Sequence, residues 1–225
     1  MAINSAGSAQ TTTIAQTQPG QEPILVVVMG VAGTGKSTLA QALDKRLGMP
    51  YIEGDDLHPQ SNIDKMAAGH PLTDADREPW LELLRNTAES IAADPTRPTR
   101  GVMITCSSLK KYYRDILRGT YTLHDRGPDH IHAHLLPAAR RRPLKTFFVY
   151  IKGDVPLLRE RMAKRQGHFM KPEMLDSQLA TLESPEGEEG VVVVPLDLTT
   201  NEQVEVALAE LKKQVPDLEL RPATP

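Results

Sequence analysis

A buried strand that leads into a glycine-rich loop constrains the fold of this chain more than any other feature. Residues 24–29 are all apolar and mostly β-branched, which is typical of a strand covered on both faces. The next eight residues, 30–37, fit the pattern G-x-x-x-x-G-K-[ST] at every fixed position. Glycines let successive backbone N–H groups turn inward around phosphate oxygens, and a helix expected over 36–47 would direct its positive end at the same anion. The pattern therefore predicts a site for a nucleoside triphosphate.

Two side chains of this loop have individual roles in such chemistry. The Lys36 ammonium can reach the β- and γ-phosphates, and the Ser37 hydroxyl can bind Mg²⁺. The alternative is an accidental glycine-rich turn, which the preceding strand and the amphipathic pattern of 36–47 disfavour. The residues expected to bind the nucleotide here are Gly30, Val31, Ala32, Gly33, Thr34, Gly35, Lys36, Ser37 and Thr38.

Composition limits the partners of the chain. Its 225 residues suffice for one α/β domain with an ample core. The net charge of −3 provides no overall basic field, so neither nucleic acid nor an anionic membrane is an expected partner. No apolar run approaches the about 18 residues of a membrane span. The single cysteine, Cys106, excludes an internal disulfide and suits a reducing compartment, so we expect a cytoplasmic location.

The folded domain is expected over 23–215. Residues 1–22 are rich in Ser, Thr, Gln, Ala and Gly without apolar periodicity, and they lack the features of a signal peptide or presequence. They are expected to be a disordered tail, and 216–225 a second frayed tail.

Between these limits, apolar strands alternate with helical patterns. Strands are expected at 24–29, 50–52, 101–106, 145–151 and 191–196, and helices at 36–47, 61–68, 73–93, 108–117, 156–165, 172–182 and 201–214. This alternation predicts a five-stranded parallel sheet with helices on both faces. Ligands of such sheets bind beyond the carboxyl ends of the strands, so the polar residues that follow each strand are the candidates for chemistry.

Three carboxylates follow the second strand. A phosphoryl acceptor needs a carboxylate that orients its hydroxyl and takes its proton, and Mg²⁺ needs oxygen partners. Side-chain alternation would place Glu53 and Asp55 on one side and turn Asp56 away. We therefore expect Asp55 to be the base and Glu53 to bind the metal through water, with Asp56 as the alternative base. A solvated acidic turn is the simpler alternative for the stretch by itself.

Two basic clusters follow later strands. Lys110 and Arg114 would share a face of the helix after the third strand, or they would simply form a basic surface. No Asp follows this strand and no N-K-x-D tetrapeptide occurs, so a GTPase switch is disfavoured. The arginine-rich end of the helix at 156–165 runs into a Gly-containing loop, which predicts a lid at about 164–172. We expect Arg161 and Arg165 to bind the nucleotide there, with Arg165 on the transferring phosphoryl; solvated surface arginines are the alternative.

Several ordered stretches of this sequence resemble gluconokinases. The resemblance runs from Val27 to about Val194 and rests on the phosphate loop together with Gly54–Pro59, Asn62, Lys65-Met66, Pro71–Leu81, Cys106–Asp115, Arg165–Phe169, Gln178 and Thr181–Glu183. The family implies a three-layer α/β/α P-loop kinase fold with strand order 2-3-1-4-5 and a lid, as in shikimate and nucleoside monophosphate kinases. It also implies transfer of the ATP γ-phosphoryl, with Mg²⁺, to the terminal hydroxyl of D-gluconate, whose product feeds the pentose phosphate pathway.

The resemblance also gives roles to residues that composition leaves open. Gluconate carries one carboxylate and a row of hydroxyls, so its site should combine cations with many hydrogen-bonding groups. Trp80 is expected to pack beneath this site as a core residue. The resemblance also implies a homodimer as a possible assembly. The expected acceptor-binding residues are Asp55, His58, Asn62, Lys65, Arg77, Lys110, Arg114 and His168.

This sequence departs from the family pattern in two places. Ser107-Ser108 stands where Ser-Ala is frequent, a change expected to matter little. The segment 120–143 is longer than in bacterial members and carries an H-x-H-x-H pattern beside the triplet Arg140–Arg142. No Cys or carboxylate cluster completes a metal site there, so a flexible inserted loop is the favoured interpretation.

Two other functions stay open at this point. A related kinase could act on shikimate or another polyol acid, and a non-catalytic regulator could bind the nucleotide without a small acceptor. The acceptor-like stretches around Asp55 and Arg77 count against the regulator, because a switch needs no pocket for a polyol.

Overall fold

The five predicted strands form one parallel sheet in the expected order. The computed structural model describes residues 22–94, 96, 101–121, 144–164 and 172–222. Within these ranges the sheet has the order β2-β3-β1-β4-β5. All four strand pairs are parallel, and β1 lies at the centre between β3 and β4. The strands are β1 (Ile24–Met29), β2 (Tyr51–Glu53), β3 (Gly101–Thr105), β4 (Lys145–Lys152) and β5 (Val191–Pro195).

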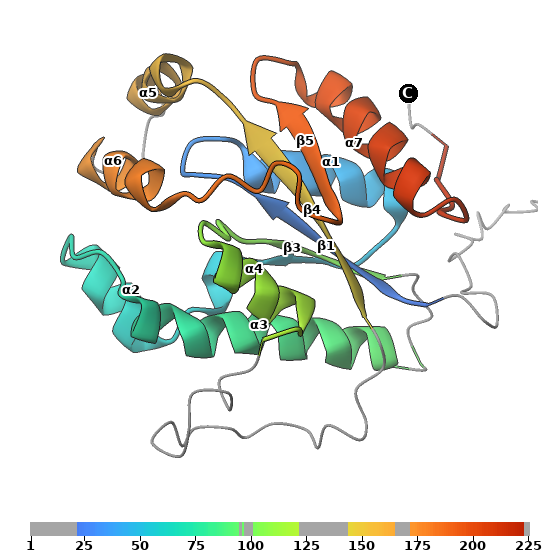
Figure 1. The fold of residues 1–225 in the computed structure, drawn as a ribbon, viewed down its shortest axis with the longest axis horizontal. Coiled ribbons are helices and arrows are strands. Elements are labelled where there is room, and N and C mark those ends of the chain that lie inside the picture. Colours follow the sequence, from blue (N-terminus) through green and yellow to red (C-terminus); the bar gives the residue numbers. More distant parts are fainter. Residues whose placement is uncertain (1–21, 95, 97–100, 122–143, 165–171, 223–225) are drawn as a thin grey trace, which may run out of the picture.

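Helices cover both faces of this sheet and make a three-layer α/β/α architecture (Figure 1). Helices α1 and α7 pack on one face, and α3 and α4 pack on the other. The helices are α1 (Lys36–Leu47), the short 3₁₀ helix η1 (Gly54–Leu57), α2 (Gln60–Ala67), α3 (Asp74–Ala93), α4 (Lys111–Arg118), α5 (Val155–Lys164), α6 (Pro172–Thr181) and α7 (Thr200–Gln214).

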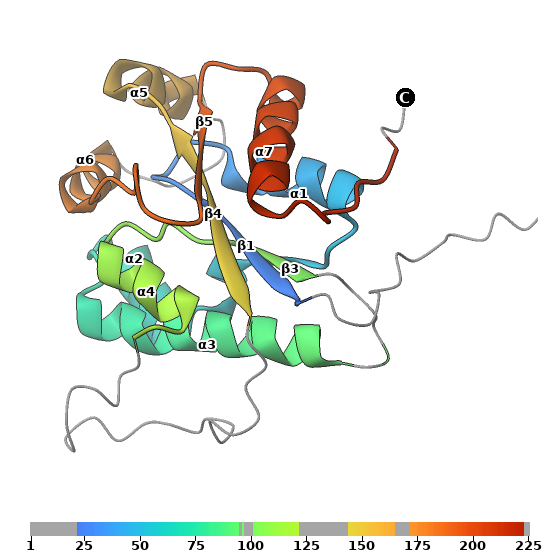
Figure 2. The same ribbon diagram turned by 45° about the vertical axis from the view of Figure 1, so that its right-hand side comes forward.

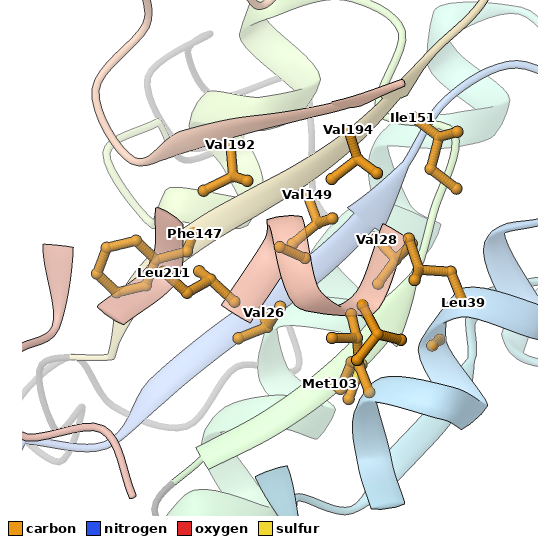
Figure 3. Close-up of a cluster of buried hydrophobic side chains, with 14 of the residues drawn as sticks. Val26, Val28, Leu39, Met103, Phe147, Val149, Ile151, Val192, Val194 and Leu211 are labelled. Carbon is orange, nitrogen blue, oxygen red and sulfur yellow. The ribbon is translucent and has the colours of Figure 1, made fainter. Parts of the chain in front are cut away.

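The central strand β1 is buried on both faces, as its sequence predicts. Every residue of β1 is buried, and alternate side chains belong to different core clusters because successive residues of a strand point to opposite faces. Val26 and Val28 pack with Leu39 of α1 and Leu211 of α7 (Figure 3). Leu25, Val27 and Met29 pack toward α3 and α4 on the opposite face.

The carboxyl ends of the strands lie at one edge of the sheet, where α2, α5 and α6 gather (Figures 1 and 2). Three connections meet at this edge: the loop after β1, the η1 segment after β2 and the turn after β3. The fold thereby brings together segments that lie far apart in the sequence. This edge is where a ligand site of a parallel α/β sheet is expected.

Two predicted boundaries shift for local reasons. The helix expected to begin at 108 begins at Lys111, because Ser108 has a left-handed backbone (φ 48°) and Lys110 is extended. The strand expected at 50–52 lies at 51–53 and leads directly into η1. Helix α3 begins where expected, because Thr73 and Asp76 form a reciprocal capping box at its start.

The expectation of a frayed tail from residue 216 onward is wrong. Leu218 is 2% exposed and belongs to the core cluster beneath α1 and α7. The backbone N–H of Arg221 donates to the Arg46 carbonyl (2.7 Å), and the Arg46 guanidinium donates to the Arg221 carbonyl (3.2 Å). The packed chain therefore extends past Val215 to at least Arg221.

Three expectations concern other parts of the chain. The expectations for the N-terminal tail, the inserted loop and the lid fall on residues that the structure largely does not describe. These are 1–21, most of 120–143 and most of 164–172. No helix within the described ranges has the length and apolarity of a membrane span.

Candidate active site

The loop between β1 and α1 has the shape of a phosphate cradle. Gly30, Gly33 and Gly35 all have positive φ, at 144°, 81° and 86°. Gly35 is the N-cap of α1 and adds no side-chain cap, so the first-turn N–H groups of the helix face the loop. A helix N-terminus of this kind favours an anion through its dipole.

Polar contacts hold this loop in place. The buried Thr34 hydroxyl donates to the Val31 carbonyl (2.8 Å), and the Lys36 ammonium reaches the same carbonyl (3.2 Å). The N–H of Ala32 donates to the Gln178 side-chain carbonyl (2.7 Å) from α6, 146 residues away. Gln178 was not among the predicted site residues; only its place in the family resemblance could have indicated it.

Glu53, at the end of β2, accepts hydrogen bonds from three hydroxyls. The Ser37 hydroxyl donates at 2.6 Å, the Tyr51 hydroxyl at 2.5 Å, and Thr105 also donates to the carboxylate. Burial alone would raise the pKa of Glu53, but these three hydrogen bonds and the Lys36 charge outweigh it, so its pKa lies below the usual range. Glu53 is thus an ionised carboxylate in contact with the last residue of the phosphate loop.

The η1 turn directs Asp55 to the pocket, and not the alternation of side chains along a strand. Residues 54–57 form a 3₁₀ turn, so the alternation that singled out Asp55 does not apply there. A side chain at Gly54 would place its Cβ 2.0 Å from the Thr105 carbonyl, so the close approach of η1 to β3 requires glycine. Asp55 and Asp56 are both exposed, but only Asp55 lines the pocket, together with Lys36.

The electrostatics of Asp55 differ from those of Glu53. Asp55 is accessible from the pocket, yet the surrounding protein raises its pKa by desolvation. The Lys36 charge opposes this shift, and the charges of Glu53 and Asp56 add to it. Asp55 is therefore a stronger proton acceptor than an ordinary aspartate.

The pocket itself combines polar groups with apolar walls. It is bounded by the phosphate loop, η1, α2, α3, the turn after β3, α4 and α6. Its lining residues are Ala32, Lys36, Asp55, His58, Met66, Leu72, Arg77, Trp80, Leu81, Ser107, Ser108, Leu109, Tyr113, Met174 and Gln178. Arg77 and Asp55 are a cation and a carboxylate that were both predicted to bind the acceptor. They thus share one pocket with Lys36 of the phosphate loop.

His58 is held in one orientation by its neighbours. Its ring stacks on Trp80 with 3.9 Å between centroids. The Asn62 amide nitrogen contacts His58 Nδ1 (3.3 Å) and donates to the Asp76 carbonyl (2.9 Å). Because an amide nitrogen only donates, Nδ1 accepts and Nε2 carries the proton. Burial, and then the charge of Arg77, lower the His58 pKa to about 4, so the ring is neutral near pH 7.

Trp80 behaves as the predicted core residue and also bounds the pocket. It is 5% exposed, and its Nε1 donates to the Gly54 carbonyl (2.9 Å). The Arg77 guanidinium donates to the Leu72 carbonyl (2.5 Å) and lies over the Tyr113 ring. These contacts fix two walls of the pocket.

Several predicted acceptor ligands are engaged elsewhere. Lys65 forms an ion pair with Asp76 (2.5 Å), and Lys110 donates to both carboxylate oxygens of Asp74 (2.8 Å each). Neither lysine lines the pocket, and Asn62 acts on it through His58. The expectation that Arg114 binds the acceptor directly is wrong: it is fully buried and paired with Glu188.

The remaining predicted nucleotide ligands lie outside this pocket. Thr38 is exposed on α1, and Arg161 donates to the Leu196 carbonyl (2.7 Å). Arg165 and His168 lie outside the described residues. A second hollow lies at the carboxyl ends of β4 and β5, lined by Lys152, Gly153, Asp154, Leu157, Val193, Pro195 and Asp197.

The sheet has the order β2-β3-β1-β4-β5, with a phosphate cradle after β1 and a carboxylate facing it after β2. These features define a P-loop kinase of the small-molecule class. The AAA domain family matches residues 26–183. The gluconokinase of Gluconobacter oxydans is 41% identical over 179 residues, which are 80% of this chain and 86% of the relative. The thermoresistant gluconokinase of Escherichia coli is 36% identical and covers 84% of this chain and 94% of its own. The chain belongs to the gluconokinase family.

A solved structure agrees with these relatives. The crystal structure of a gluconokinase from Sinorhizobium meliloti is 38% identical, with a TM-score of 0.68, and covers 88% of this chain and 97% of its own. The family resemblance seen in the sequence is confirmed, and with it the fold class and the assignment as a kinase.

Proposed function

We propose that this protein catalyses the ATP-dependent phosphorylation of D-gluconate at its terminal hydroxyl, giving 6-phospho-D-gluconate and ADP. The observation that carries this proposal is that Lys36 of the phosphate loop and Asp55 line the same pocket as His58 and Arg77. The names of the relatives supply the acceptor, since gluconokinases of Gluconobacter oxydans and Escherichia coli match most of the chain.

The pocket suits an acceptor that carries one carboxylate and several hydroxyls. Arg77 supplies the positive charge for a carboxylate, and the protonated Nε2 of His58 supplies a donor for an oxygen atom. Ser107 adds a hydroxyl to the same wall. Lys65, Lys110 and Asn62 support the walls of this pocket through their contacts with α3.

Asp55 acts as the base in this proposal. The Asp55 carboxylate orients the terminal hydroxyl and accepts its proton while the hydroxyl oxygen forms a bond to the γ-phosphorus. The bond from that phosphorus to the oxygen bridging it to the β-phosphate breaks, and ADP leaves. Lys36 and the N–H groups at the start of α1 stabilise the charge on the transferring group.

The residues around Ser37 fit Mg²⁺. The Ser37 hydroxyl and the ionised Glu53 carboxylate are 2.6 Å apart, and magnesium prefers a few oxygen ligands together with waters and phosphates. Ser37 would bind the ion directly and Glu53 through water. When bound, Mg²⁺ would neutralise phosphate charge.

The nucleoside and the lid complete the proposal. The hollow at the ends of β4 and β5, next to the start of α5, offers space for the nucleoside. Arg161 and Arg165 are proposed to contact the nucleotide, and His168 the acceptor, when the segment at about 164–172 closes. We further propose a cytoplasmic location, a homodimeric assembly and supply of the pentose phosphate pathway. The single buried Cys106 is consistent with the cytoplasmic location.

A coupled ADP-release assay tests this function. Wild-type protein with ATP and Mg²⁺ should release ADP rapidly with D-gluconate and far more slowly with shikimate or without any acceptor. Lys36→Ala should reduce gluconate-dependent turnover greatly while the protein stays folded, because Lys36 faces the ligand site and not the core. Turnover of shikimate without turnover of gluconate would contradict the proposed acceptor. Acceptor-independent ADP release alone would favour a nucleotide-dependent regulator.

A further inference from the structure

We propose that Arg114 is a positioning residue for the acceptor pocket: its buried guanidinium holds the turn after β3 in the shape that forms one pocket wall. This inference rests on the proposed function for its kinetic readout. It also gives a role to the residue whose expected contact with the acceptor proved wrong.

The turn in question consists of Ser107, Ser108 and Leu109, and all three line the pocket. Ser108 has φ 48°, the only positive φ of a non-glycine residue among those that the structure describes. Such a conformation is costly for a residue with a Cβ and persists only where the surroundings impose it. Ser108 is 2% exposed, and its hydroxyl has no hydrogen-bond partner in the described part of the chain. The Cys106 thiol interacts with this hydroxyl, but a thiol is a weak hydrogen-bond partner, so the serine side chain contributes little to holding the turn.

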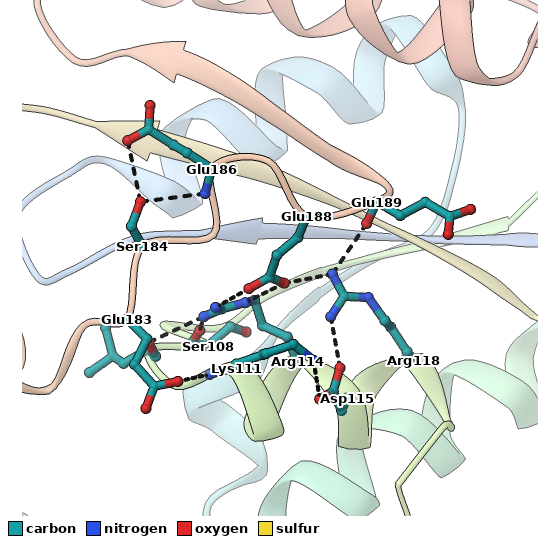
Figure 4. Close-up of polar contacts among 11 residues, drawn as sticks. Ser108, Lys111, Arg114, Asp115, Arg118, Glu183, Ser184, Glu186, Glu188 and Glu189 are labelled. Carbon is teal, nitrogen blue, oxygen red and sulfur yellow. Dashed lines mark hydrogen bonds and ion pairs between the residues drawn. The ribbon is translucent and has the colours of Figure 1, made fainter.

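Arg114 supplies the contacts that impose this conformation. Its Nη1 donates to the Ser108 carbonyl (2.8 Å) and to the Leu109 carbonyl (3.2 Å). Its Nε and Nη2 donate to the two carboxylate oxygens of Glu188, at 3.0 and 2.5 Å (Figure 4). One planar group thus joins two successive carbonyls of the turn to a carboxylate from the segment before β5.

The segment between α6 and β5 clamps the turn from the same side. The Glu183 N–H donates to the Leu109 carbonyl (2.8 Å), and the Glu183 carboxylate accepts the Lys111 N–H (2.6 Å) at the start of α4. Arg118 donates to Glu188 as well (2.9 Å), which fixes that carboxylate (Figure 4). The turn is therefore held between α4 and the chain that follows α6.

Arg114 itself does not line the pocket, so it acts on the acceptor only through this turn. A lysine would keep the charge but could not donate to both carbonyls and both carboxylate oxygens at once. Without that fork, Ser108 can leave the left-handed region and shift the wall. Across the described segments, the hydrogen-bond partners of Arg114 are the two turn carbonyls and Glu188, none of which belongs to the phosphate loop, so nucleotide binding should be spared.

The test measures steady-state kinetics for Arg114→Lys. The KM for gluconate should rise by about tenfold, since small misplacements at a reacting centre are costly, while the KM for ATP stays within about twofold. Glu188→Gln, which keeps the shape of the partner but removes its charge, should show the same pattern more weakly. Glu188→Gln also tests the inference if Arg114→Lys does not fold.

Arg85→Lys is the matched control. Arg85 is also a buried arginine: it pairs with Glu89 (2.6 Å) and donates to the Leu117 carbonyl (2.8 Å), the Leu144 carbonyl and Thr146. These contacts lie at the amino end of β4, away from the pocket. Arg85→Lys should cost stability without a selective change in the KM for gluconate. An equal effect of both arginine variants on acceptor KM would overturn the inference.

Rescue by glycine is specific to the proposed role. Glycine adopts a φ of 48° without strain, so Ser108→Gly in the Arg114→Lys background should restore most of the lost acceptor affinity. A crystal structure of Arg114→Lys, which does not depend on turnover, should show Ser108 outside the left-handed region. An unchanged turn in that structure, or no rescue, would contradict the inference. Failure of wild-type protein to use gluconate would instead contradict the proposed function.

Discussion

At the scale of single residues, two nearby carboxylates have opposite electrostatics. Hydrogen bonds from Ser37, Thr105 and Tyr51 outweigh burial and lower the pKa of Glu53, whereas desolvation raises the pKa of Asp55. Environments that separate two pKa values in this way are typical of sites that divide roles between two groups. Glu53 is suited to remain an anion beside a metal ion, and Asp55 is suited to accept a proton.

Asp55→Asn tests this division of roles. The amide keeps the shape of the side chain but cannot accept the proton of the hydroxyl, so kcat should fall about 10²- to 10⁴-fold while ATP still binds. Asp56→Asn is the control, because Asp56 carries the same charge next to Asp55 but does not line the pocket. Rates and nucleotide affinity should be measured for both variants. If Asp56→Asn is inactive and Asp55→Asn is not, the base is the neighbouring residue.

The environment of His58 makes a prediction about pH. Its folded-state pKa of about 4 lies below the ordinary histidine value of 6.5, so the folded protein favours the neutral ring. An unfolded chain binds a proton on this residue below pH 6.5, so stability should fall as the pH is lowered from 6.5 toward 4.

NMR titration of the His58 ring and urea unfolding of wild type and His58→Gln should show this effect. The difference in unfolding free energy between the two proteins should be constant above pH 6.5 and change only between 6.5 and 4. Loss of the stacking on Trp80 would give His58→Gln a constant offset. A ring that titrates near its ordinary pKa would refute the buried, neutral state.

At the scale of secondary-structure elements, α3 and α6 carry most of the site's organisation. Asp76 caps α3 through Thr73 and also pairs with Lys65 of α2, so one carboxylate joins two helices beside the pocket. Helix α6 contacts the phosphate loop through Gln178, and the residue Glu183 just beyond it caps the start of α4. Lys65 and Glu183 thus contribute to the site by fixing helices, and not by direct contact with its pocket.

At the scale of the whole molecule, the chain after α7 completes the packing of one face. Leu218 lies in the core cluster with α1 and α7, and Leu220 packs against it. The reciprocal bonds between Arg46 and Arg221 tie this segment to the end of α1. These contacts lie on α1 at the end opposite its phosphate-binding N-terminus.

Truncation after Val215 should therefore destabilise the protein without a direct effect on chemistry. Loss of the buried Leu218, its N–H bond to the Val215 carbonyl and the two bonds between Arg46 and Arg221 should cost about 2–4 kcal/mol of unfolding free energy. Truncation after Pro222 is the control, because it keeps all of these contacts. Urea unfolding gives the free energies, and kcat at low temperature should be unchanged in both proteins. Equal stability of the two truncations would show that Leu218 and Arg221 add nothing.

Local sequence determined the elements and the phosphate loop of this protein. The apolar run at 24–29, the glycine spacing at 30–37 and the capping residues at Thr73 and Asp76 each act over a few neighbours. The rules for these features need only the residues within one strand or one helical turn. Five strands alternating with helices also favoured a parallel sheet, and the family resemblance supplied its order.

Tertiary structure decided which side chains meet. The spacing of Lys110 and Arg114 fits a cationic face, but only the fold reveals that Glu188, 74 residues later, pairs with Arg114 and buries it. Asp55 faces the pocket because Gly54 lets η1 pack closely on β3, and Gln178 reaches the phosphate loop from 146 residues away. Leu218 is buried because α1 and α7 leave space for it. Such contacts depend on distances between segments that are remote in sequence, which local patterns do not encode.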